Sequence, residues 1–82
     1  MMNELFDRSK AEKILDRYPQ LEVLLQAGMV SKKLCREVLD LDKWLMDDLY
    51  KDMLLAGMIK GTSISCFRAK EDTLLLIRER KN

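Results

Sequence analysis

Apolar residues recur with helical spacing through the first two thirds of the chain, and breaker residues divide this part into four segments. Ser9 and Glu12 have the spacing of a capping box, which predicts the start of a first helix; residues 5–6 either extend it or form a flanking arm. Pro19 ends this helix, because proline has no N–H to donate, and it also suits the first turn of the next helix. Gly28 is expected to end the second helix in a left-handed conformation. The predicted inward faces carry Ile14, Leu15, Tyr18, Leu21, Leu24 and Leu25.

A short polar turn joins two further predicted helices. Ser31 is expected to cap a helix over residues 32–39, and Asp42, at the end of the turn, a helix over residues 43–56. Gly57 then ends the fourth helix. The apolar stripe of the third helix is predicted to be Leu34, Cys35 and Val38. The buried side of the fourth is predicted to be either Leu45 or Met46, followed by Leu49, Met53 and Leu54.

After Gly61 the pattern changes from helical to extended. Residues 62–69 are rich in β-branched and small side chains, residues 70–72 have the composition of a turn, and residues 73–79 follow as a second strand. These segments predict a hairpin with a loop of about three residues. The continuous apolar run over residues 74–77 indicates a strand that is covered on both faces or lies against a partner.

The order of these elements is that of a winged helix-turn-helix: helices, a tight turn, a helix, a glycine and a hairpin. Residues 30–59 resemble the helix-turn-helix core of small bacterial, archaeal and phage winged-helix regulators. Leu34-Cys35 stands where that family has a Leu-Ala pair. Residues 53–59 match the family's sequence pattern of an apolar residue, three variable residues, a glycine and two apolar residues. The turn Leu39-Asp40-Leu41-Asp42 is one residue longer than the family's usual turn and lacks its common glycine.

The resemblance implies one winged-helix domain over residues 1–82, mainly α with a β-hairpin. Its N-terminal helices would lie within residues 4–27, the helix-turn-helix over residues 31–57 and the wing over residues 62–80.

Composition narrows the possible functions. Hydrophobic residues make up 48% and charged residues 35% of the chain, which is typical of a globular protein. The chain has no histidine, which removes Ser-His and Cys-His nucleophile pairs and the usual zinc sites. Its three glycines stand apart and form no phosphate-binding loop. We therefore expect no enzyme activity, cofactor, metal or small-molecule substrate.

The cysteines and the apolar runs indicate in which cellular compartment the protein is expected. Cys35 and Cys66 have no CxxC spacing, so we expect two reduced thiols in a cytoplasmic protein; an intermolecular or structural disulfide is the alternative. No apolar run reaches the about 18 residues that a membrane helix needs. The first eight residues contain acidic side chains and no apolar signal core, so neither a membrane segment nor a secretion signal is expected.

The net charge of +1 hides an uneven distribution. Residues 1–30 carry four basic and five acidic side chains, whereas residues 31–36 carry three basic ones and no acidic one. Residues 37–59 have two basic and six acidic side chains, and residues 60–82 have six basic and three acidic ones. In the winged-helix family the two positive segments would flank a duplex and contact its phosphates.

The first hypothesis, which the resemblance implies, is a transcriptional regulator of phage, plasmid or other mobile-element type. It would bind double-stranded DNA as a homodimer, and its dimer contact would come from the N-terminal helix or the strand at residues 73–77. The alternative for its charges is a solvated helix face and protection of an edge strand. The candidate DNA-binding residues are Lys32, Lys33, Arg36, Lys43, Trp44, Lys51, Arg68 and Lys70.

The second hypothesis is a winged-helix protein–protein interaction module that does not bind DNA. Its candidate interface residues are Trp44, Leu45, Asp47 and Asp48. A helix cannot bury Trp44, Leu45 and Met46 against one core, so at least one of them is expected to be exposed. The alternative for Trp44 is packing in the core.

Overall fold

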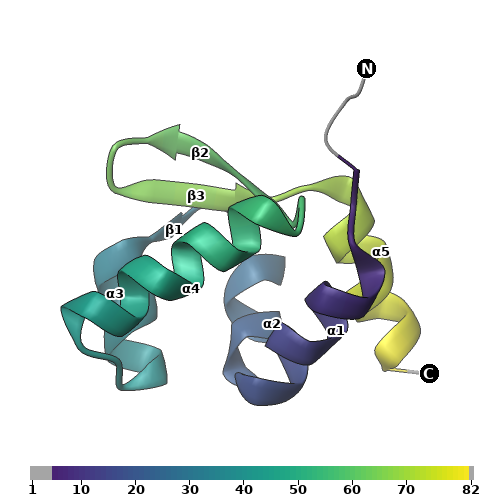
Figure 1. Ribbon diagram of the computed structural model, residues 1–82, viewed down its shortest axis with the longest axis horizontal. Coiled ribbons are helices and arrows are strands. Elements are labelled where there is room, and N and C mark those ends of the chain that lie inside the picture. The colour runs from purple at the N-terminus through teal and green to yellow at the C-terminus, as the bar shows by residue number, and fades with distance from the viewer. Residues whose placement is uncertain (1–4, 82) are drawn as a thin grey trace.

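A small sheet lies along one side of the molecule, and the helices pack below it and beyond one of its ends (Figure 1). The computed structural model describes residues 5–81, and residue 4, where the predicted helical region begins, lies outside them. The elements in chain order are α1 (Arg8–Arg17), α2 (Gln20–Gln26), β1 (Val30–Ser31), α3 (Lys32–Leu39), α4 (Lys43–Leu55), β2 (Ile59–Ser63), β3 (Cys66–Ala69) and α5 (Glu71–Arg80). This order confirms the predicted fold class, which is mainly α with a β-hairpin in a winged-helix arrangement.

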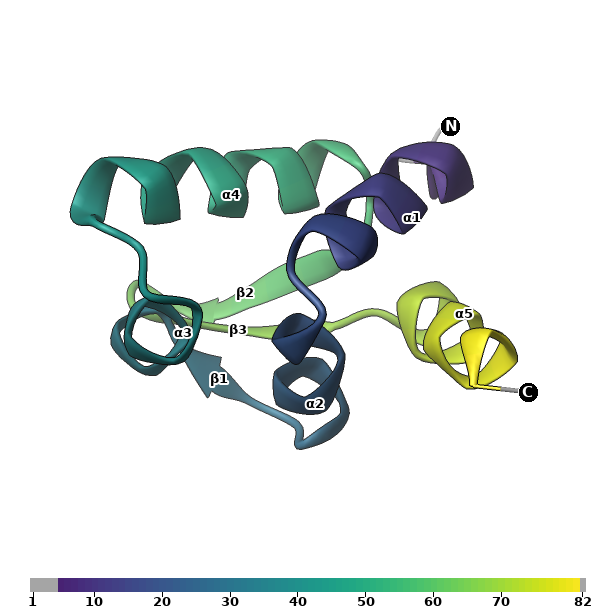
Figure 2. The same ribbon diagram turned by 90° about the horizontal axis from the view of Figure 1, so that it is seen from below.

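The sheet is antiparallel and has the strand order β1-β3-β2, so β3 is the central strand. Val30 pairs with Phe67 on one side of β3, and Ile59 pairs with Ala69 on the other. A register shift between Gly61 and Ser63 bends the hairpin near its tip. Figure 2 shows α4 running alongside the β2–β3 hairpin, with α1 and α5 at the opposite end of the molecule from the hairpin tip.

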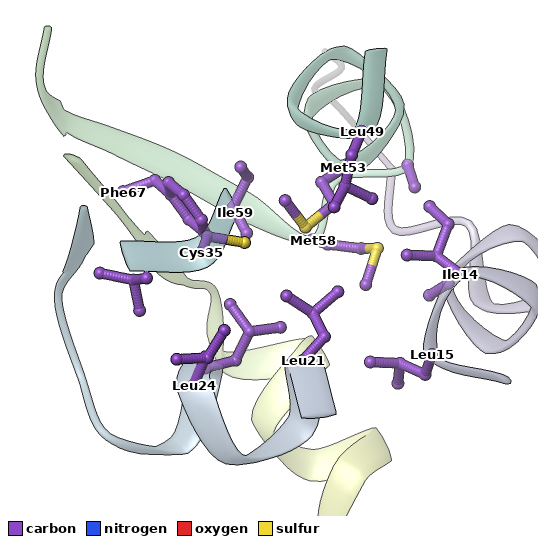
Figure 3. Packing of buried hydrophobic residues seen from close by; sticks show 14 of the residues in the cluster. Ile14, Leu15, Leu21, Leu24, Cys35, Leu49, Met53, Met58, Ile59 and Phe67 are labelled. Carbon is purple, nitrogen blue, oxygen red and sulfur yellow. The ribbon is translucent and has the colours of Figure 1, made fainter. Parts of the chain in front are cut away.

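The core lies between the sheet, α2 and α4 (Figure 3). The inward residues predicted for α1 and α2 are buried, except that Tyr18 is half-buried. In α4 the buried residue is Met46 and not Leu45, and it is followed by Leu49 and Met53. Leu54, predicted to be buried, is 40% exposed, because it lies one helical position beyond this stripe.

The predicted apolar stripe of α3 is wrong at two positions. Cys35 is fully buried and Leu39, one turn later, packs against the core, whereas Leu34 and Val38 are exposed. Successive residues in a helix are rotated by about 100°, so the neighbours of Cys35 and Leu39 point to the side. Helix α3 therefore packs against the core only through the narrow stripe formed by Cys35 and Leu39.

Two of the three predicted side-chain N-caps are confirmed. The side chains of Ser31 and Asp42 accept hydrogen bonds from the third residue after them, as N-caps do. The first cap is Asp7 and not Ser9, because the Asp7 carboxylate accepts from the Lys10 N–H at 3.0 Å and α1 begins two residues earlier than predicted. Residues 5–6 therefore belong to a flanking arm.

The predicted strand over residues 73–79 is wrong, since this segment is helix α5. Thr73, Leu76 and Ile77 are its buried residues, which is the spacing of a helical face. Glu71 and Asp72 in its first turn and arginines in its last turn suit the helix dipole. The true hairpin turn is Ile64-Ser65, so the wing spans residues 59–69 instead of 62–80.

Both cysteine thiols are free. Cys35 is buried and Cys66 is half-buried, and burial raises the pKa of the Cys35 thiol to about 11. Cys35 is therefore protonated at neutral pH and packs as a small apolar side chain. Within residues 5–81, no helix combines the length and the apolar character that crossing a bilayer requires.

We expect Thr73→Val to lower the free energy of unfolding by about 1 kcal/mol, because it removes a buried hydrogen bond. The Thr73 hydroxyl donates to the Met58 carbonyl oxygen at 2.8 Å and ties α5 to the start of β2. Thr62→Val is the control, since Thr62 is exposed and should change stability little. Urea denaturation measures both variants, and equal midpoints would contradict this role of Thr73.

Candidate nucleic-acid interface

Helix α4 has one side that packs in the core and an opposite side that faces solvent. Met46, Leu49 and Met53 point into the core, so the opposite side faces solvent. We call this side the outward face of α4; its residues are Trp44, Asp48, Lys51 and Leu55. Trp44 is 75% and Leu55 is 74% exposed, which rules out core packing for Trp44.

The three predicted DNA-binding residues on α3 differ in the groups that they contact. The Lys32 ammonium lies 3.8 Å from the centre of the Tyr50 ring, a cation–π contact. The backbone N–H of Lys32 donates to the Ser65 carbonyl oxygen at 2.8 Å. Arg36 donates from Nε to the Leu41 carbonyl at 3.4 Å. Lys33 is exposed and forms no such contact. Of this cluster, Lys33 is the side chain most available to a ligand.

Tyr50 connects α4 to the wing. The Tyr50 ring packs edge-on against the Phe67 ring, with centroids 5.7 Å apart, and the Lys32 ammonium lies over the face of the Tyr50 ring. A Cβ on Gly61 would lie 3.0 Å from the Tyr50 hydroxyl oxygen, so the glycine leaves room for the ring. Nothing in the linear pattern identifies Tyr50, because its partners come from α3 and both strands of the hairpin. These contacts fix the wing relative to α4.

The outer face of the wing is basic. Lys60 pairs directly with Arg68 across β2 and β3, and each of them follows a buried residue, Ile59 and Phe67 respectively. Sequence reasoning missed Lys60, because the hairpin turn was misplaced. Both side chains line an open groove of about 420 Å³ together with Ala69, Lys70, Glu71 and Leu74.

The pairing of Lys60 with Arg68 is unfavourable in the isolated protein. Like charges directly opposite each other in an antiparallel ladder destabilise it. Protection of an edge strand accounts for charge on β2, but not for Arg68, because β3 is the central strand. A phosphate or another anion in the groove would remove the repulsion.

The cations of the helix-turn-helix and wing differ from the arginines at the other end of the molecule. Arg8 bridges Glu12 and Glu79, and Arg80 bridges Asp16 and Glu22, joining α1, α2 and α5. The hydrogen bonds that Arg80 donates to Asp16 and Glu22 raise the pKa of its guanidinium above the usual value. Within residues 5–81, a second group of cations forms no ion pair: Lys33, Lys43, Lys51, Lys60 and Arg68.

The predicted DNA-binding residues thus fall into three places rather than one patch. They lie on α3, along α4 and on the wing, except that Lys70 follows the wing, immediately precedes α5 and is half-buried. The residues predicted for a protein interface are all exposed in the first half of α4. Of these, Leu45 and Asp48 also line a shallow groove of about 170 Å³ between α1 and α4.

In comparisons with known proteins, no family model, curated protein or solved structure matches the chain.

We expect Gly61→Ala to be tolerated better when Tyr50 is also changed to Phe. The added methyl group would press on the Tyr50 hydroxyl oxygen, and phenylalanine lacks that atom. Thermal unfolding of the two single variants and the double variant gives the coupling free energy, which should favour the double variant by about 0.5 kcal/mol or more. Additive effects would show that Tyr50 does not hold this strand in place.

Proposed function

We propose that this protein is a winged-helix DNA-binding protein that acts in transcription regulation. The start of α3, the exposed lysines of α4 and the outer face of the wing would contact the phosphates of a duplex. The single observation that carries the proposal is the cross-strand pair of Lys60 and Arg68, because its repulsion is relieved by a bound anion. The winged-helix arrangement supports duplex DNA as that anion.

Binding of this kind would depend more on the DNA backbone than on base edges. Phosphate contacts position a protein on the duplex, whereas base-edge contacts supply sequence specificity. The middle of α4 offers Lys51 between Asp48 and Asp52, and these carboxylates repel the duplex. We therefore expect a strong dependence on salt and modest discrimination between sequences.

One part of the proposal changes with the corrected fold. The segment expected to supply a dimer contact as a strand is α5, so of the two predicted dimer contacts of a DNA-bound homodimer only the N-terminal helix remains as predicted. The proposed site of action is the cytoplasm, where both thiols would remain reduced.

Fluorescence anisotropy with a labelled random-sequence duplex, measured at several salt concentrations, tests the proposal. We expect Lys33→Ala and Arg68→Ala each to weaken binding and to reduce the slope of log affinity against log salt by about 1, as the loss of one phosphate contact does. Lys13→Ala, which removes an equal charge from an exposed position on α1, is the control and should bind like the unmodified protein. No measurable binding at low salt, or equal losses in all three variants, would refute the proposal.

A second candidate function is a protein–protein interaction module. The specific observation in its favour is the 75% exposure of Trp44, beside the exposed Leu45 and two aspartates. Tryptophan is enriched among residues that dominate binding energy at protein interfaces. Carboxylates next to an exposed apolar side chain suit a protein surface better than a phosphate backbone.

A further inference from the structure

The outward face of α4 has a spacing suited to pairing with another helix. Its four residues are separated by intervals of four, three and four positions. This is the spacing that lines up side chains along the contact of two helices packed nearly parallel or antiparallel. The apolar ends of the stripe, Trp44 and Leu55, are about three-quarters exposed.

The stripe is also complementary to itself when it is reversed. It consists of an apolar, an acidic, a basic and an apolar residue in that order. If a second α4 runs antiparallel to the first, Trp44 faces Leu55 of the second copy and Asp48 faces Lys51 of the second copy. A two-fold axis near the middle of the helix produces both contacts twice, as an isologous interface requires.

We propose that α4 pairs antiparallel with α4 of a second copy of this chain through this face. The parallel alternative is disfavoured, because it would place Asp48 opposite Asp48 and Lys51 opposite Lys51. In the antiparallel pair, the apolar contacts supply most of the attraction, and the opposite charges set direction and register. This face shares Trp44 and Asp48 with the candidate protein interface, so a second copy of the chain would cover part of that interface.

The interface is small. One pair of 13-residue helices buries less than the about 1,600 Å² of a standard protein interface. Association is therefore expected to be weak and reversible, with a dissociation constant in the micromolar to millimolar range. If the proposed DNA binding also uses this face, duplex and second copy compete for it; this consequence alone rests on the proposed function.

Sedimentation of the full chain over a range of concentrations tests the pairing, with Asp48→Lys and Lys51→Asp as the main variants. We expect the unmodified protein to form dimers at high concentration. Each variant places like charges opposite each other twice in the dimer, which should raise the dissociation constant by about tenfold or more. Lys13→Asp, on the exposed side of α1, is the control and should leave dimerisation unchanged.

A mixture of the two variants gives the sharpest result. In a heterodimer of Asp48→Lys with Lys51→Asp, every charge at these positions again faces its opposite, so the mixture should associate where each variant alone does not. The D48K/K51D double variant should likewise recover self-association. A chain that remains monomeric at millimolar concentration, or a mixture that fails to associate, would overturn the proposal. Neither result depends on DNA, so the failure of DNA binding is seen separately by anisotropy.

Discussion

Burial of one side of α4 is the constraint on which the rest of the molecule depends. Met46, Leu49 and Met53 enter the core together, and their spacing determines which side of the helix remains in water. The outward side then carries Trp44, and the position next to the core carries Tyr50. The same burial therefore exposes the outward face of α4 and places the ring of Tyr50 against the wing.

The wing is held in place by a set of contacts that crosses three elements. Tyr50 from α4 packs on Phe67 from β3, and Lys32 from α3 covers the ring of Tyr50. The hairpin tip adds a backbone hydrogen bond from Lys32 to Ser65. Because these contacts fix the inner face of the hairpin, the basic side chains of its outer face project from a rigid support. A rigid support lowers the entropy lost when a phosphate is bound.

The sequence predicts those features of the fold that depend on local chemistry. Side-chain caps at Ser31 and Asp42 and the inward residues of α1 and α2 follow from nearby residues alone. The helix α5 could not be distinguished from a strand, because a short apolar run has no period that separates the two. The position of the hairpin turn could not be predicted, because Ile64-Ser65 contains neither the glycine nor the asparagine that marks a two-residue hairpin loop. In the tight turn, Asp40 adopts the left-handed conformation, with φ of 56°, that glycine commonly supplies.

The candidate site was only partly predictable. Whether Trp44 is exposed depends on which of three adjacent apolar residues is buried in the core. Lys60 and Tyr50 can be recognised as site residues only from their contacts with residues distant in the sequence. The central claim is that the helix-turn-helix and the wing together form the face that binds DNA. NMR titration of isotope-labelled protein with a short duplex tests it most directly. We predict that amide signals shift at the start of α3, along α4, in β2 and β3 and in the first turn of α5, which lines the groove, while those of α1 and the last turns of α5 remain in place. Shifts confined to α1 and α5, or no shifts at low salt, would contradict the account.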